Sequence, residues 1–208
     1  MIETLIGLGI LAIVSTSIYQ AYANILQVVQ AAQYNSAALN IMESHVEMIR
    51  NMRYEDVGTA GGVPYGKLPQ TTTAVLDGTS FDLHIYVRNI DDTFDGTLGG
   101  TPNDTAPADY KLVELQVTCT TCTRYNVARM ATYVAPKNLE SSSKRGNLFI
   151  RVFDSAGQPV SGATVHVTNT AVSPAIDLTD VTNTAGLLQL VDTATSSAKY
   201  HIAVSKAG

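Results

Sequence analysis

The sequence predicts an α+β fold in which a long N-terminal helix packs on an antiparallel β-sheet and a small all-β sandwich follows. Residues 1–53 contain no proline and have glycine only at positions 7 and 9. The rest of the chain instead alternates short apolar stretches with glycine-containing turns. At 208 residues, of which 45% are hydrophobic, the chain is long enough to build one or two domains with cores of their own.

Residues 1–53 predict one continuous helix of about 80 Å, because Ala, Leu, Ile, Gln, Met and Glu dominate this region. No charged residue lies between Glu3 and Glu43. Residues 5–18 are apolar or small, apart from the hydroxyl residues at 15–17. A helix that is apolar on all sides is typical of a membrane span or of the core of a filament.

The second half of the same helix has a different pattern. Its apolar residues recur at spacings of three and four, with polar residues between them, which predicts a stripe that lies against a sheet. The residues of the predicted stripe are Ile25, Val28, Val29, Ala32, Leu39, Met42, Val46 and Ile49.

Residues 54–140 predict a β-sheet head domain. Glycines and a proline within residues 61–66 form a loop that follows the helix. Residues 81–88 alternate between apolar and polar side chains, residues 111–118 repeat this alternation, and residues 124–135 give a third strand. We therefore expect three or four antiparallel strands against the back half of the helix.

A polar linker at residues 141–146 is expected to separate the head from a small β-sandwich at residues 147–208. Short strands at regular intervals, separated by glycine turns, indicate the sandwich. The expected strands are residues 147–154, 163–168, 187–191 and 200–204, with turns at 155–162 and 182–186.

Glu3 is the one carboxylate in the apolar front of the helix. Insertion scales assign a cost of roughly 2.5–3.5 kcal/mol to an acidic residue at mid-membrane. A simple anchor has no use for such a residue, so we expect a cation on another molecule to neutralise Glu3.

Residues 1–14, MIETLIGLGILAIV, resemble the N-terminus of mature type IV pilins and pseudopilins, which combine an apolar pair, a glutamate and a long aliphatic helix. The resemblance implies that Glu3 pairs with the N-terminal amine of a neighbouring subunit. It implies a prepilin peptidase, an assembly ATPase and a platform membrane protein as partners, N-methylation, and a mature N-terminus slightly before Met1. The residues that it assigns to assembly are Glu3, Met1, Ile2, Leu5 and Ile6.

A second resemblance concerns the C-terminal region. Residues 152–165, VFDSAGQPVSGATV, with the turn at 184–186, resemble carboxypeptidase regulatory-like domains of transthyretin-type fold. This resemblance implies a spacer or binding module without catalytic residues. Such domains usually continue after the position of the last predicted strand, so we expect the domain to extend beyond Gly208.

An acidic loop is the candidate metal site. Residues 91–104 gather carboxylates in a glycine-containing segment, and calcium takes roughly six to eight oxygen ligands of this kind. The candidate ligands are Asp91, Asp92 and Asp95. The spacing is not that of an EF-hand, and the alternative is a solvated acidic loop.

Cys119 and Cys122 lie between two predicted strands. Outside the cytoplasm we expect them to form a local disulfide, which stabilises by roughly 2 kcal/mol through chain entropy and fixes the turn. A redox centre would need a helix N-terminus beside the thiols, and a zinc site would need two more ligands nearby.

The remaining features favour a structural protein over an enzyme. The net charge of −5 and the absence of basic runs argue against nucleic acid as the main partner. The histidines are scattered, and neither a nucleophile elbow nor a phosphate loop is present. We expect no catalytic activity and no cofactor other than calcium.

The function that follows from the helix and its resemblance is that of a pilin. We expect a homopolymeric subunit of an extracellular type IV pilus, held in the cytoplasmic membrane before assembly, with surface adhesion by the C-terminal domain. Two alternatives remain open: a minor pilin or type II secretion pseudopilin, and a monomeric membrane-anchored extracellular binding protein.

Overall fold

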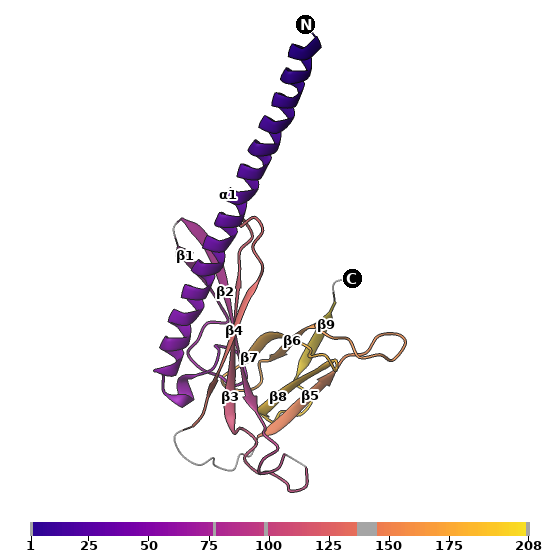
Figure 1. The fold of residues 1–208 in the computed structure, drawn as a ribbon. Coiled ribbons are helices and arrows are strands. Elements are labelled where there is room, and N and C mark those ends of the chain that lie inside the picture. Colours follow the sequence, from indigo (N-terminus) through magenta and orange to yellow (C-terminus); the bar gives the residue numbers. More distant parts are fainter. Residues whose placement is uncertain (1, 77, 98–99, 137–144, 207–208) are drawn as a thin grey trace.

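A computed structural model describes residues 2–76, 78–97, 100–136 and 145–206. One long helix, α1 (Ile2–Arg50), projects far beyond a β-rich body (Figure 1). Its 49 residues correspond to a length of about 74 Å. The helix packs on an antiparallel sheet and further strands follow, which confirms the predicted α+β fold class.

The sheet beside α1 is antiparallel throughout and has the strand order β1–β2–β3–β4. Its strands are β1 (Thr71–Leu76), β2 (Thr79–Ile90), β3 (Tyr110–Thr118) and β4 (Ala128–Val134). Apolar residues of the two inner strands pair across the register, for example Ile85 with Leu115. Both side chains belong to the core that the sheet forms with α1.

The predicted helix stripe is correct only near the end of α1. Met42, Val46 and Ile49 are buried, but the prediction that the other members of the stripe lie against the sheet is wrong. The exposed members are Ile25, Val28, Val29, Ala32 and Leu39. Ala38 and Ile41 are buried in their place, because the sheet covers only the last part of α1 and a small alanine lets the helix approach it closely.

The remaining strands form a sandwich of two small sheets. One sheet pairs β5 (Gly146–Arg151) with β8 (Leu187–Thr193). The other has the order β7–β6–β9, with β6 (Thr164–Asn169), β7 (Ile176–Val181) and β9 (His201–Ser205). Apolar residues of both sheets, including Ile150, Val167 and Leu190, share one buried core.

Several predicted boundaries differ from the structure. The helix ends at Arg50 rather than at residue 53, and a short 3₁₀ turn, η1 (Tyr54–Asp56), follows it. Strands β1 and β7 were not predicted. Most of the predicted linker, residues 141–144, lies outside the described residues, as do Met1 and Gly208, and Gly146 already belongs to β5.

Polar contacts join the sandwich, which lies beside the four-stranded sheet (Figure 1), to β2 and to the loop that follows η1. Arg88 on β2 donates from Nε to Asp180 Oδ2 on β7 at 2.7 Å. The Asn89 side chain donates to the carbonyl of Val191 on β8 at 3.1 Å. The Asp177 amide donates to the carbonyl of Gly61, a glycine at φ +76° where a Cβ would meet Asp177 O at 2.8 Å.

Candidate assembly surface

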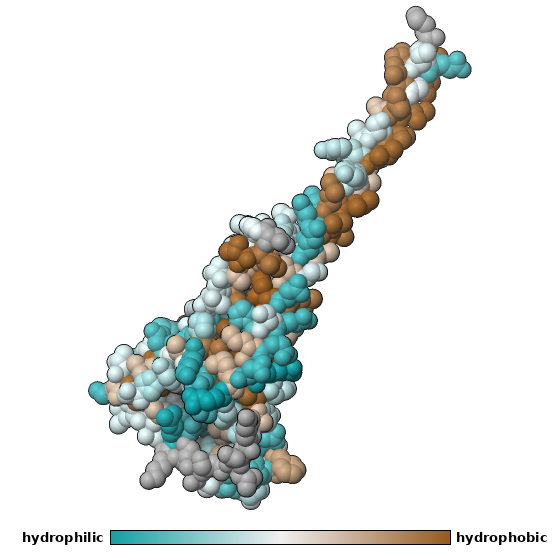
Figure 2. Space-filling view, turned by 90° about the vertical axis from the view of Figure 1, so that its left-hand side faces the viewer, coloured by the Kyte–Doolittle hydropathy of each residue, from teal (hydrophilic) through white to brown (hydrophobic). Residues whose placement is uncertain are grey.

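The front of α1 is an apolar surface that no other described residue covers. Ile2, Leu5 and Ile6 are 75%, 69% and 58% exposed. From Ile2 to Val29 every large apolar side chain of the helix is exposed. Figure 2 shows them as a continuous hydrophobic column that leaves the more polar body.

The hydroxyl groups of Thr16 and Ser17 within this column are satisfied by the helix itself. Thr16 donates its hydroxyl to the carbonyls of Ala12 and Ile13 at 3.0 and 2.9 Å, and Ser17 donates to Ile13 at 2.8 Å. A hydroxyl bonded to its own helix needs no water. These residues are therefore compatible with an environment of lipid or of packed helices.

Glu3 lies in the first turn of α1 and is exposed. Within the part of the chain that the structure describes, no Lys, Arg or His side chain forms an ion pair with it. The carboxylate is thus placed at the tip of the apolar column, where a cation on a second molecule can reach it.

Water is a poor environment for this surface. Burying one leucine or isoleucine side chain stabilises by about 1.5–3 kcal/mol, while a whole domain is stable by only about 5–15 kcal/mol. By length and composition α1 can cross a membrane, and none of its most apolar stretch is buried within the molecule. The helix can therefore be covered by lipid or by other apolar helices.

Lys111 holds the other end of the helix region in place. Its Nζ donates to the carbonyls of Tyr54 and Val57 at 2.8 and 2.6 Å and lies 4.4 Å from the centre of the Tyr54 ring. Burial of the amine lowers the pKa of Lys111 to about 8. This contact ties η1, and through it the end of α1, to strand β3.

This role of Lys111 was not predicted, although the alternation of residues in β3 indicates it. Lys111 shares a strand face with Val113, Leu115 and Val117, all of which are fully buried. A lysine at such a position has to be paired within the core, because an unsatisfied buried ammonium is costly.

The acidic loop does not gather its carboxylates. Asp92 accepts hydrogen bonds from the Phe94 amide at 3.0 Å and from the Tyr110 hydroxyl at 3.3 Å, and Asp91 accepts one from Asn147 at 3.4 Å. Asp95 is exposed. Among the described residues, no three His, Cys, Asp or Glu side chains lie close enough to hold a metal ion, so the structure adds no support to the calcium hypothesis.

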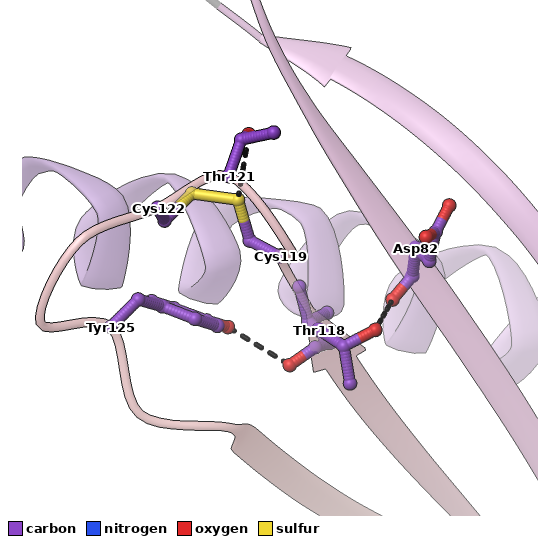
Figure 3. The surroundings of a disulfide bond; sticks show 7 residues. Asp82, Thr118, Cys119, Thr121, Cys122 and Tyr125 are labelled. Atoms are coloured by element: carbon purple, nitrogen blue, oxygen red, sulfur yellow. Dashed lines mark hydrogen bonds between the residues drawn. A yellow bond between two sulfur atoms is a disulfide. The ribbon is translucent and has the colours of Figure 1, made fainter.

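Cys119 and Cys122 are joined by a disulfide in the turn between β3 and β4 (Figure 3). Two hydrogen bonds hold the chain on either side of it. The Tyr125 hydroxyl donates to the Val117 carbonyl at 2.9 Å, and the Thr118 hydroxyl donates to the Asp82 carbonyl at 3.3 Å. The bridge closes a local turn and lies far along the chain from Glu3.

No protein-family model matches this chain, and neither a curated protein nor a solved structure is significantly similar to it. Its shape therefore has to be described from its own geometry. A long apolar N-terminal helix carries an antiparallel β-sheet domain, an arrangement compatible with a pilin-like protein.

Proposed function

We propose that this protein is a structural subunit of a type IV pilus, in which the front halves of many α1 helices pack together and the β-rich bodies coat the outside. The observation that carries the proposal is the unpartnered apolar column from Ile2 to Val29 on a helix whose other end is buried in the body. Packing against copies of itself would remove this surface from water without any change in the body.

Glu3 has a specific part in this proposal. In a bundle of apolar helices an unpaired carboxylate is expensive, so docking that brings a cation to Glu3 is favoured over docking that does not. The charge thereby selects one arrangement of neighbouring helices. The N-terminal amine of an adjacent subunit is the cation that the sequence resemblance implies.

The proposed life cycle has two stages. Before assembly α1 holds the subunit in the cytoplasmic membrane, with the body outside. A prepilin peptidase, an assembly ATPase and a platform membrane protein then act on it, and the mature subunit becomes part of an extracellular filament. The sandwich lies on the filament surface, where it is available for adhesion.

The test is to express the full chain with its export and assembly machinery and to examine sheared cell-surface material by electron microscopy. We compare the unchanged chain with Glu3→Gln, which keeps the side-chain shape and removes the charge. Glu43→Gln is the matched control, because Glu43 is an exposed carboxylate on the same helix beyond the apolar column.

We expect filaments from the unchanged chain and from Glu43→Gln. Glu3→Gln should leave the protein in the membrane fraction and abolish filaments. If Glu3→Gln assembles as well as the control, the proposed role of the carboxylate is wrong. If the unchanged chain stays monomeric in the membrane, the chain is an anchored binding protein instead.

A further inference from the structure

Two neighbouring clefts lie between the four-stranded sheet and the sandwich. The larger has a volume of about 800 Å³ and the smaller about 340 Å³. Tyr86 and Asp180 line both, so the two clefts adjoin at these residues, and we refer to them together as the groove. Tyr86 alternates with Ile85 and Val87, which face α1, and therefore lies on the opposite, outer face of the sheet.

Four of the polar side chains along this groove have no polar partner in the described part of the chain. In the described part of the chain, the side chains of Tyr86, Gln116, Arg129 and Gln189 make no hydrogen bond or ion pair. Gln116 and Arg129 are direct partners in the register of β3 and β4. Tyr86 and Gln116 come from the neighbouring strands β2 and β3, and Gln189 lies on β8 at the opposite wall.

Charges in the groove are close to balanced. Its wall contains the guanidinium groups of Arg88 and Arg129 and the carboxylates of Asp91, Glu114 and Asp180. Arg88 is occupied by Glu114 at 2.8 Å and by Asp180 at 2.7 Å. With nearly equal numbers of each sign, the groove has no strong field that would attract a polyanion or a polycation.

The Tyr86 hydroxyl is partly shielded from water. Burial is the main reason that the pKa of Tyr86 is raised above its ordinary value, and the nearby Asp180 carboxylate acts in the same direction. The phenol is therefore a neutral hydrogen-bond donor and acceptor on an aromatic ring at the meeting point of both clefts.

We propose that this groove binds a neutral oligosaccharide. Sugar hydroxyls need donors and acceptors in alternation, which carboxamides, a phenol and a guanidinium supply. The apolar face of a sugar ring needs an aromatic partner, which Tyr86 supplies. A few placed polar groups on a concave surface are what orient such a ligand.

A peptide strand fits the wall built by β2 and β3 less well. Extended peptides bind by pairing with an unpaired strand edge, but β2 and β3 are inner strands and each has neighbours on both sides. This wall therefore offers side chains rather than a free row of main-chain groups. Strands β4, β7 and β8, which also line the groove, each lie at the edge of a sheet, and the peptide probe below tests these edges.

The test measures binding by isothermal titration calorimetry with the full chain in detergent. The neutral probes are cellohexaose, maltohexaose and chitohexaose. Polygalacturonate and an uncharged extended peptide are measured separately, as probes for a charged polysaccharide and for a peptide ligand. We expect one neutral hexasaccharide to bind. Tyr86→Ala should weaken its binding about tenfold, and Gln116→Ala should weaken it without affecting the aromatic contact.

Tyr133→Ala is the matched control, since Tyr133 is an exposed tyrosine on the same sheet that lines neither cleft. Equal affinity in Tyr86→Ala, Gln116→Ala and the control would overturn the proposal. Binding of none of the neutral probes, or of polygalacturonate or the peptide only, would also overturn it. Solubilised subunits suffice, so the result is independent of whether the chain forms filaments.

Discussion

The two ends of α1 have similar apolar composition but opposite surroundings. Near its end, Met42 and Ile49 are fully buried against the sheet, whereas Leu11 and Ile13 near its start are 61% and 68% exposed. The end of the helix is covered by the sheet of the same chain. In the part of the chain that the structure describes, no element covers the front of the helix.

This difference separates two kinds of stability. Substitutions in the body should change the free energy of unfolding of the single subunit. Substitutions in the front of α1 should leave that free energy unchanged and affect only insertion or assembly. Each of the following measurements uses the full chain in detergent, with tyrosine fluorescence as the probe of unfolding.

The largest effect is expected at the ion pair that joins the two parts of the body. Burial opposes the charge of Arg88, but Asp180 and Glu114 outweigh it and hold the pKa of Arg88 above its ordinary value. The Asp180 side chain is 7% exposed, so Arg88→Met leaves a buried, unpaired carboxylate and should cost about 3–5 kcal/mol of unfolding free energy.

The double variant Arg88→Met/Asp180→Leu is the control for this ion pair. Replacing both partners removes the uncompensated charge, so most of the lost stability should return. A cost of about 1 kcal/mol or less for Arg88→Met alone would mean that the pair behaves like a surface salt bridge.

A somewhat smaller effect is expected in the helix–sheet core. Met42→Ala removes a fully buried side chain and should lower the free energy of unfolding by about 2–5 kcal/mol. Met48→Ala, at a 47% exposed position on the same helix, should change it by less than about 0.5 kcal/mol. Equal effects of the two substitutions would contradict the packing of α1 on the sheet.

Lys111 makes the free energy of unfolding of the body depend on pH. Its pKa in the folded chain is about 8, against an ordinary value of 10.5, so the unfolded chain binds more protons between these values. The contribution of Lys111 to stability should therefore rise with pH, by about 2 kcal/mol between pH 7 and pH 9.5.

The comparison with Lys111→Met isolates this contribution, because both proteins share all other titrating groups. The difference in unfolding free energy, unchanged chain minus variant, should grow in favour of the unchanged chain as the pH rises. A difference independent of pH would show that the amine stays charged in the folded chain over this range.

The smallest effect on unfolding is expected at the front of α1. Leu11→Ala should change the unfolding free energy by less than about 0.5 kcal/mol, because Leu11 is 61% exposed on the projecting part of α1. Under the proposed function it should nevertheless reduce the yield of filaments seen by electron microscopy. Destabilisation as large as that of Met42→Ala would contradict the division of the helix into two parts.

Sequence patterns predicted the elements whose side chains follow a simple period. The alternation of β2 and β3 and the apolar front of α1 are of this kind. Strand β7 was missed because its inward row is Ile176, Leu178 and Asp180, and a carboxylate at a core position hides the apolar alternation. Its partner, Arg88, lies 92 residues away in the sequence.

Two further differences between the predicted and the observed structure concern strand β1 and the buried face of α1. Strand β1 begins with three threonines and is half-exposed at the sheet edge, so it lacks the apolar row that identifies a strand. The burial of Ala38 instead of Leu39 depends on how α1 is rotated about its axis on the sheet, which the three- and four-residue spacing does not determine for neighbouring positions. For the candidate site, the sequence predicted the apolar column and the position of Glu3, whereas the groove at Tyr86 arises only from tertiary contacts.

The polar contacts between the sandwich and the rest of the body determine how a mechanical force would be transmitted through the molecule. A force applied to the sandwich reaches α1 by way of β2, β7 and β8, through the contacts of Arg88, Asn89 and Asp177. The three contacts act in parallel between the sandwich and the rest of the body, so separating the two parts requires all of them to break.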